Sequence, residues 1–368
     1  MSLFGEVLVE ENNYIYFVPF FGNALYRYDK KRKENFWLGS FKGQSEDEWA
    51  YRLFGAMIKV DEKIFVAPSC GNSIINIYDI KEKQFGHIDL RGYLADKEMM
   101  DKDKLPCKFV AIYRFKDYLY FLGCTFPAIV RLSLSNMNVD YIDGWHKLLK
   151  DYTFYCQPGI IRDAEGLFPF AESAGLLKID LETGVFEIIE VKSAAQGFMG
   201  VVAGIENDLW VLDGKELKCI NISENGDVLE EVKLNIKADK GKNHGIIKNP
   251  IGDGKGMYIF PVWTDHVYYF SFYDKKLEIC EEFDEIISRE LGKKDIDNRR
   301  VMIVSPKPNY VYMIEYHSQY WNEIYLPTRE YNSFIVNEDL LHKWSRGVMV
   351  FAENNNELND FIRLVKQQ

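Results

Sequence analysis

Hydrophobic and polar residues alternate in short runs along most of this chain. Ile-Tyr-Phe at 15–17 and Ala-Leu-Tyr-Arg-Tyr at 24–28 show the pattern. A period of two places successive side chains on opposite faces of a β-strand. The runs are followed by turn-forming residues at 21–23, 70–72, 182–184 and 225–227, each of which includes a glycine. The pattern therefore predicts many short strands separated by tight turns.

One pair of runs recurs along the chain. It begins as Tyr14-Ile-Tyr-Phe-Val-Pro followed by Gly22-Asn-Ala-Leu-Tyr-Arg-Tyr-Asp29, and weaker copies start at positions 63, 118, 166, 208, 257 and 310. A period of about fifty residues is typical of radial or stacked repeat proteins. Each repeat reads as four strands, which in the second repeat are 54–60, 63–68, 73–79 and 84–90. Strands this short cannot bury their faces alone, so neighbouring units must stack.

Four-stranded units of this size close naturally into a ring that protects the sheet edges. On repeat length and strand order, the chain resembles the seven-bladed β-propellers, kelch-like in the broad sense, over residues 3–336. It lacks the paired glycines of kelch blades and the Gly-His and Trp-Asp pairs of WD40 blades, so no function is carried over residue by residue. The resemblance implies an all-β fold of four-stranded antiparallel blades. An eight-bladed ring and an open solenoid are the structural alternatives.

Three segments depart from the repeat. Residues 94–106 are long and charged, and they are compatible with a short helix or an excursion over one face. Residues 283–298 are similar and carry apolar residues at helical spacing. We expect solvated loops in both segments rather than partner-binding helices. The tail, residues 337–368, contains a stretch from 346 that opens like 299–304, which is compatible with a closing strand or a partial extra blade. Its last part, 357–367, reads better as a helix packed on the ring.

Composition narrows the classes of partner. The chain carries 56 acidic and 45 basic residues, a formal net charge of −11. This balance disfavours nucleic acid as a partner, because such binding depends on Lys and Arg neutralising phosphates. It also disfavours attachment to an anionic membrane. The start of the chain shows no signal-peptide pattern, and no run reaches the roughly 18–20 apolar residues of a membrane helix, so we expect a cytoplasmic location.

The six cysteines contain no CxxC pair, which favours free thiols in a reducing compartment. Cys70, Cys107, Cys124 and Cys156 all fall on the same predicted end of the ring. Thiolates can bind zinc, but a tetrahedral site needs its sulfurs around one centre, and the blades place these residues on separate turns. Small buried thiols are therefore expected. No metal and no cofactor is predicted.

Propeller topology brings two sets of loops to one end of the ring: the links between blades, and the turns between second and third strands. Ligand sites usually lie where such loops converge on a rigid scaffold. Aromatic rings stack on sugars or side chains, and Arg, Gln and His supply directional hydrogen bonds. The candidate ligand-binding residues share this end and these side-chain types: Trp49, Arg52, Lys108, Gln157, Glu172, His244, Trp263, Asp265, His266, Arg300, His317 and Trp321.

The sequence contains no GxSxG, phosphate-binding loop or HExxH motif, so no catalytic residue is assigned. The leading hypothesis is a non-catalytic binding or interaction scaffold that presents the loop-rich face to a protein or glycan partner. The alternative is a carbohydrate-acting enzyme, a hydrolase or lyase, with Glu172, Asp265, His266 or His317 in acid–base roles on the same face. A third option is an assembly subunit that contacts partners along the blade rims.

Overall fold

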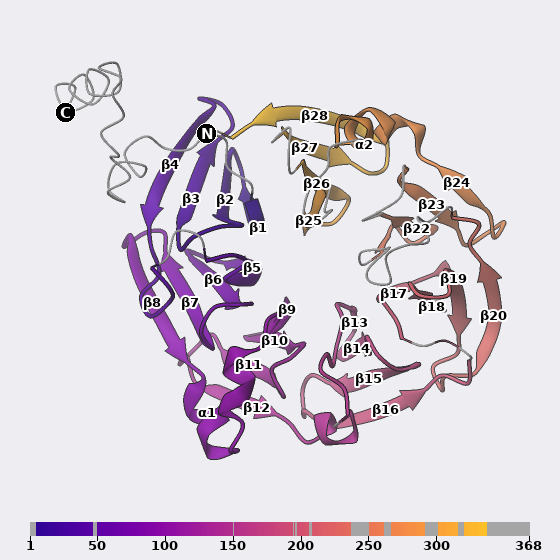
Figure 1. Ribbon diagram of the computed structural model, residues 1–368, viewed down its shortest axis with the longest axis horizontal. Coiled ribbons are helices and arrows are strands. Elements are labelled where there is room, and N and C mark those ends of the chain that lie inside the picture. The colour runs from indigo at the N-terminus through magenta and orange to yellow at the C-terminus, as the bar shows by residue number, and fades with distance from the viewer. Residues whose placement is uncertain are drawn as a thin grey trace.

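The computed structural model describes residues 5–46, 50–149, 151–193, 195, 197–205, 208–236, 250–260, 266–290, 301–315 and 320–336. Over these residues the chain forms seven four-stranded antiparallel sheets arranged as a ring of blades (Figure 1). The predicted seven-bladed β-propeller is confirmed, and the eight-bladed and open alternatives are wrong. The helix predicted within residues 337–368 lies outside the described residues.

Every blade consists of four strands that are consecutive in the sequence. Blades 1 and 2 contain β1 (Gly5–Glu11), β2 (Tyr14–Pro19), β3 (Leu25–Asp29) and β4 (Glu34–Gly39), then β5 (Phe54–Val60), β6 (Lys63–Pro68), β7 (Ile74–Asp79) and β8 (Gln84–Asp89). Blades 3 and 4 contain β9 (Phe109–Phe115), β10 (Tyr118–Gly123), β11 (Ile129–Ser133) and β12 (Val139–Ile142), then β13 (Ile160–Arg162), β14 (Glu165–Pro169), β15 (Gly175–Asp180) and β16 (Phe186–Glu190).

Blade 5 contains β17 (Gly200–Ala203), β18 (Leu209–Asp213), β19 (Lys218–Ile222) and β20 (Val228–Lys233). Blade 6 contains β21 (Ile251–Gly252), β22 (Gly256–Ile259), β23 (Tyr268–Ser271) and β24 (Leu277–Ile279). Blade 7 contains β25 (Val301–Lys307), β26 (Tyr310–Glu315), β27 (Tyr320–Tyr325) and β28 (Glu330–Ile335). The first strand of each blade lies nearest the centre of the ring and the fourth forms the rim (Figure 1).

Burial along the strands follows their radial position. The second strands β2, β6 and β10 are apolar and buried at all but their first residue, because they have a strand on each side and a blade against each face. Every residue of the rim strand β8 is exposed or half-buried, since it has a strand on one side only. This difference explains why the second strands supplied the clearest copies of the repeat.

The tight turns depend on side chains that the sequence repeats. The Asp29 carboxylate ends β3 and accepts hydrogen bonds from two backbone N–H groups of the next turn at 2.9 and 3.0 Å. Asp180 ends β15 in the same way, with bonds of 2.8 and 2.9 Å. Gly184 completes that second turn at a φ of 76°, a conformation that glycine adopts without steric cost. Asp at the end of the third strand is therefore a turn signal.

Adjacent blades pack face to face through apolar clusters. Phe65 and Ile75 of blade 2 share one cluster with Leu119, Phe121 and Leu132 of blade 3. Such a wedge of side chains between each pair of sheets holds a propeller together, because burial of apolar area is the main favourable term in folding.

Blades 7 and 1 are each complete without a strand from the other, so the described part of the ring closes through side-chain contacts and not through a shared sheet. β25 lies beside β1, and Tyr312 and Trp321 of blade 7 share an apolar cluster with Phe17 and Tyr26 of blade 1.

Short helices occupy both charged segments that interrupt the repeat. The first contains α1 (Arg91–Asp96) and the 3₁₀ turn η1 (Met100–Lys104), and Tyr93 and Leu94 are buried against blades 2 and 3. The second contains the 3₁₀ turn η4 (Glu281–Phe283) and α2 (Asp284–Glu290), whose Ile286 and Ile287 are buried. A short helix was one of the two expectations for 94–106, and all but Leu94 of that segment is exposed or half-buried. The prediction of a solvated loop is wrong for the described start of 283–298, because its buried apolar residues dock α2 on the ring.

A further 3₁₀ turn, η2 (Trp145–Leu149), lies in the link between blades 3 and 4. Within the described residues, none of the helices combines the length and the apolar character needed to cross a membrane.

Candidate functional site

The two predicted loop sets meet at one end of the ring, which we call the loop-bearing end. There the turn after the second strand of one blade accepts a hydrogen bond from the link into the next blade. The bonds run from Arg52 N–H to Phe20 O at 2.7 Å, from Lys108 N–H to Ser69 O at 3.4 Å, from Tyr155 N–H to Cys124 O at 2.7 Å and from Phe198 N–H to Phe170 O at 2.8 Å. This repeated bond fixes neighbouring loops against each other across the first four junctions.

Two exposed aromatic side chains stand together at the junction of blades 1 and 2. Phe21 and Tyr51, which we call the aromatic patch, are 38% and 51% exposed and face each other across an isolated antiparallel bridge. The Gly22 N–H donates to Ala50 O at 2.7 Å beside this bridge. The buried Phe20 ring lies below the patch, 4.9 Å from the Phe21 ring in an edge-to-face contact. The patch is therefore rigidly backed.

Arg52 adjoins the patch in sequence and is half-buried. Its backbone has a φ of 51°, a left-handed conformation that is uncommon outside glycine. Its N–H bonds to Phe20 O, and its own carbonyl accepts the Cys70 N–H at 2.9 Å. These bonds explain why the link keeps this conformation and carries Tyr51 on the surface.

Lys108 proves to be a structural residue. Its side chain is buried, and its Nζ donates to the carbonyls of Gly71 at 2.7 Å, Leu105 at 2.9 Å and Ser69 at 3.3 Å. Burial lowers the pKa of this ammonium group. Because all three donor directions are used internally, the prediction of a ligand contact at Lys108 is corrected.

The prediction of a ligand contact at Trp321 is also corrected. We expected it on an exposed turn, but β27 begins at Tyr320 and the indole ring is fully buried. It packs edge-to-face against Phe17, with ring centroids 4.9 Å apart. Period-two alternation in β27 turns this side chain towards blade 1, so it belongs to the closing core.

Gln157 and Glu172 lie together at the junction of blades 3 and 4, on the loop-bearing end. The Gln157 N–H donates to Pro169 O at 2.8 Å, and the Glu172 carboxylate accepts the Phe154 N–H at 3.1 Å. Both side chains are half-buried. Their placement at this end agrees with the topology, and a ligand contact by either one remains a prediction.

His266 forms a pair that sequence reasoning missed. Its Nδ1 lies 2.8 Å from Asp284 Oδ1, with side chains 35% and 38% exposed. Asp284 opens α2, which the link after blade 6 folds back towards the turn that carries His266. A carboxylate on one ring nitrogen orients an imidazole for proton transfer at the other. The sequence showed only a run of acids, which is typical of a solvated surface.

The remaining candidates lie outside the described residues: Trp49, His244, Trp263, Asp265, Arg300 and His317.

The four cysteines predicted at this end are found there. Cys124 and Cys156 are buried, as expected, and burial raises the pKa of both thiols. Cys70 and Cys107 are half-buried instead. No group of three or more His, Cys, Asp or Glu within the described part of the chain is arranged to hold a metal ion.

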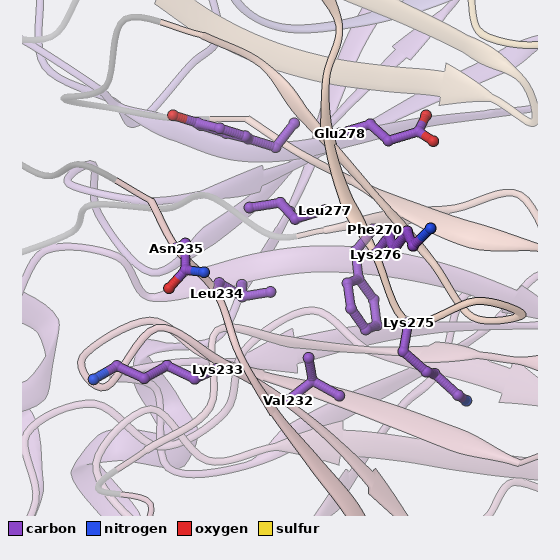
Figure 2. A pocket seen from close by; sticks show the side chains of 10 residues that line it. Val232, Lys233, Leu234, Asn235, Phe270, Lys275, Lys276, Leu277 and Glu278 are labelled. Atoms are coloured by element: carbon purple, nitrogen blue, oxygen red, sulfur yellow. The ribbon is translucent and has the colours of Figure 1, made fainter.

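A concave surface lies on the rim, between β20 of blade 5 and β24 of blade 6. It is a groove of about 400 Å³ whose apolar lining includes Leu234, Phe270 and Leu277. Figure 2 shows Lys233 and Lys275 on opposite sides of this lining. Lys275 is already paired with Glu230 at 3.3 Å. Sequence reasoning missed the groove, because rim strands read as solvated edges.

The sequence matches no protein-family model and no curated protein. Solved structures with the same fold include virginiamycin B lyase from Staphylococcus aureus, with a TM-score of 0.59 and 11% identity over 86% of this chain and 94% of that chain. A chain of the mitotic checkpoint complex has a TM-score of 0.55 and 10% identity over 92% and 91% of the two chains. YCF48 bound to D1 peptide has a TM-score of 0.52 and 9% identity over 85% and 90%. At these identities the likeness shows the fold alone, which has both enzymes and protein-binding modules among its members.

Proposed function

We propose that this propeller is a binding scaffold whose loop-bearing end takes a protein partner at the aromatic patch. The observation that carries the proposal is the exposure of Phe21 and Tyr51 side by side on a main-chain bridge. The cytoplasmic location expected from the sequence belongs to the same proposal.

Exposed aromatic rings of this kind leave apolar area in contact with water, which a partner can cover. Large aromatic side chains carry much apolar area, and they are enriched with Arg in the parts of interfaces that contribute most to binding energy. The bridge and the underlying Phe20 hold these rings before any partner arrives, so binding loses little conformational entropy. Arg52 directly follows Tyr51 in the chain and adds a cationic side chain to this junction.

Two of the fold neighbours described above support a protein partner, because one belongs to the mitotic checkpoint complex and another is bound to a peptide. Nothing comparable favours a glycan at this face, so the protein reading is preferred.

The test compares wild type with the double variant Phe21→Ser, Tyr51→Ser. Partners are captured from cells by cross-linking, identified by mass spectrometry, purified and titrated against each variant. We expect the affinity to fall at least about tenfold in the double variant, as for loss of interface anchors. Tyr273→Ser is the matched control, since Tyr273 is 87% exposed on the turn between β23 and β24, at the opposite end of the ring.

A partner that binds the double variant as tightly as wild type would place the interface elsewhere and reject the proposal. Binding on a glycan array that is lost in the double variant would replace the protein partner with a sugar.

The His266–Asp284 pair favours a second candidate function, acid–base catalysis by a carbohydrate hydrolase or lyase. An imidazole oriented by a carboxylate is suited to remove or deliver a proton. Turnover of any polysaccharide in a substrate panel, lost in His266→Ala and reduced in Asp284→Asn, would establish this reading. Equal turnover by the two variants and wild type would exclude His266 as the acid–base group.

A further inference from the structure

Cys70 and Cys107 come from different blades and meet at the loop-bearing end. Cys70 lies in the turn between β6 and β7 of blade 2, and Cys107 ends the link that leads into β9 of blade 3. The link between them contains α1 and η1, so the two residues are distant in sequence and adjacent in space.

A main-chain hydrogen bond joins the two loops that carry them. The Lys108 N–H, directly after Cys107, donates a hydrogen bond to Ser69 O, directly before Cys70, at 3.4 Å. Neither cysteine belongs to a strand, and Cys107 has a left-handed φ of 57°, so it is this bond between two loops that brings the cysteines together. The Cys107 backbone amide is also close enough to hydrogen-bond the Cys70 thiol. A disulfide requires an α-carbon separation of roughly 4.4–6.8 Å, which the two loops must supply.

The surroundings of the sulfurs agree with this geometry. Burial is the main cause that raises the pKa of the Cys70 thiol, and the Cys107 thiol and the Cys107 backbone amide are among the other groups that act on it. Lys108 clamps both loops by donating from Nζ to Ser69 O and Gly71 O on one side and to Leu105 O on the other. The clamp holds the cysteine-bearing segments together before oxidation.

Accessibility separates this pair from the other cysteines. Cys70 and Cys107 are half-buried, whereas Cys124, Cys156, Cys219 and Cys280 are buried. Cys124 is the nearest competitor, since Cys124 N–H bonds to Lys108 O and Thr125 N–H bonds to Cys107 O. It is only 1% exposed, so a soluble oxidant does not reach its sulfur.

We propose that Cys70 and Cys107 form a reversible disulfide that ties blade 2 to blade 3 across the loop-bearing end. A small-molecule disulfide such as oxidised glutathione is the oxidant. The thiolate of one cysteine attacks a sulfur of the oxidant and releases one reduced thiol, which leaves a mixed disulfide. The second cysteine, as thiolate, attacks that mixed disulfide and releases the second reduced thiol. The protein loses two protons and two electrons, and the small disulfide gains them.

The experiment equilibrates the full chain with mixtures of oxidised and reduced glutathione, quenches with acid, alkylates the free thiols under denaturing conditions and maps the peptides. We expect a cross-linked peptide pair that contains Cys70 and Cys107, full reversal by reductant, and a thermal midpoint several degrees higher for the bridged form. Cys70→Ser and Cys107→Ser each remove the cross-link, whereas Cys124→Ser, the matched control, keeps it.

A cross-link between Cys107 and Cys124, stable glutathione adducts on Cys70 or Cys107 without closure, or unchanged free thiols in fully oxidised glutathione would each overturn the proposal. If the serine variants lose their fold, the wild-type peptide map alone still decides which sulfurs pair. The readout is independent of any partner, so its failure leaves the proposed binding function untouched.

Discussion

Between blades 2 and 3 the chain is continuous, and the junction is held by main-chain hydrogen bonds and the buried Lys108 ammonium group. Between blades 7 and 1 no chain connects the described blades, and side chains from both ends of the sequence hold the junction. Lys30 Nζ lies 2.6 Å from Glu10 Oε1 and 2.8 Å from Glu323 Oε1. Lys307 Nζ lies 3.0 Å from Glu10 Oε2, to which the Tyr312 hydroxyl also donates at 3.2 Å.

The difference shows how a ring with no shared strand fixes its closing register. Apolar packing is non-directional, so a cluster of rings alone allows the two sheets to slide. A half-buried network of charges has one geometry in which every group is paired. A region opens at low free energy when few contacts are lost on opening. At the closing junction, no chain segment connects the described blades 7 and 1, so none limits how far they separate. We therefore expect the ring to open first between blades 7 and 1.

The largest predicted effect is that of Trp321→Ala in the closing core. The indole is fully buried against Phe17, Tyr312 and Phe334, and its removal leaves a cavity. We expect the free energy of unfolding to fall by about 3–5 kcal/mol. Chemical denaturation measures this loss.

Trp210→Ala is the matched control, because Trp210 is equally buried but packs on Phe272 between blades 5 and 6. Hydrogen exchange under native conditions separates the two variants. In Trp321→Ala the amides of β1, β2, β26 and β27 should lose protection first. If strands away from blades 7 and 1 lose protection first in Trp321→Ala, the closing junction is not the weakest point.

The next effect concerns Glu10→Gln. The Glu10 side chain is 5% exposed and serves both lysines, so the amide leaves their charges poorly compensated. Lys307 is partly solvated, which limits the cost, and we expect a loss of about 1–3 kcal/mol in the free energy of unfolding. Glu323→Gln, which leaves one lysine poorly compensated instead of two, should cost less.

Acid titration sharpens this prediction. Burial alone raises the Glu10 pKa, but the hydrogen bonds and charges of Lys30 and Lys307 outweigh it and hold the pKa below its usual 4.5. A lowered carboxyl pKa stabilises the fold above pH 4.5, and this stability is lost as the pH falls through the folded value. The difference between wild type and Glu10→Gln should therefore be constant near neutrality and shrink in acid. A difference that is unchanged below pH 4 would show that Glu10 contributes no ion pair.

The same comparison shows what the sequence was able to predict. Strand alternation and Asp-containing turns recur locally, so the second blade was predicted as 54–60, 63–68, 73–79 and 84–90 and is found with nearly the same bounds. A local sequence pattern carries no information about contacts between residues some 300 positions apart, such as the contact of Lys30 with Glu323. Trp321 was misplaced because the sequence did not show that β27 begins at Tyr320, and because Phe17, on which the indole packs, lies in the blade at the other end of the chain.

The loop-bearing end was likewise predicted only in part. Topology predicted which loops meet, and the bonds from Arg52 to Phe20 and from Tyr155 to Cys124 agree. It did not distinguish a lysine used internally, Lys108, from one available to a ligand, since both types precede a first strand. Asp284 was missed because the fold of the link after blade 6 is what brings it to His266.

A smaller effect is expected at alkaline pH, where the stability contributions of Lys108 and Lys30 change in opposite directions. Burial lowers the Lys108 pKa below 10.5, so stability rises with pH between the folded value and 10.5. Burial also acts to lower the pKa of Lys30, but Glu10 and Glu323 outweigh it and raise that pKa above 10.5, so its stability is lost as the pH rises through the folded value. Between pH 8 and 11, the free-energy difference from wild type should grow for Lys108→Met and shrink for Lys30→Met. The same trend in both variants would contradict the contrast between the junctions.

The smallest expected change in stability is that of Tyr51→Ser. This variant tests whether the aromatic patch, proposed to bind a partner, differs from the two junctions in contributing little to the stability of the fold. Half of the Tyr51 side chain is exposed, and the bridge to Phe21 is made by the backbone, which serine retains. Surface substitutions of this kind change the free energy of unfolding by about 0.5 kcal/mol or less. Denaturation curves should therefore nearly coincide with wild type, whereas partner affinity falls. A loss of stability comparable to that of Glu10→Gln would mean that the aromatic patch supports the junction of blades 1 and 2, and that its exposure serves the fold rather than a partner.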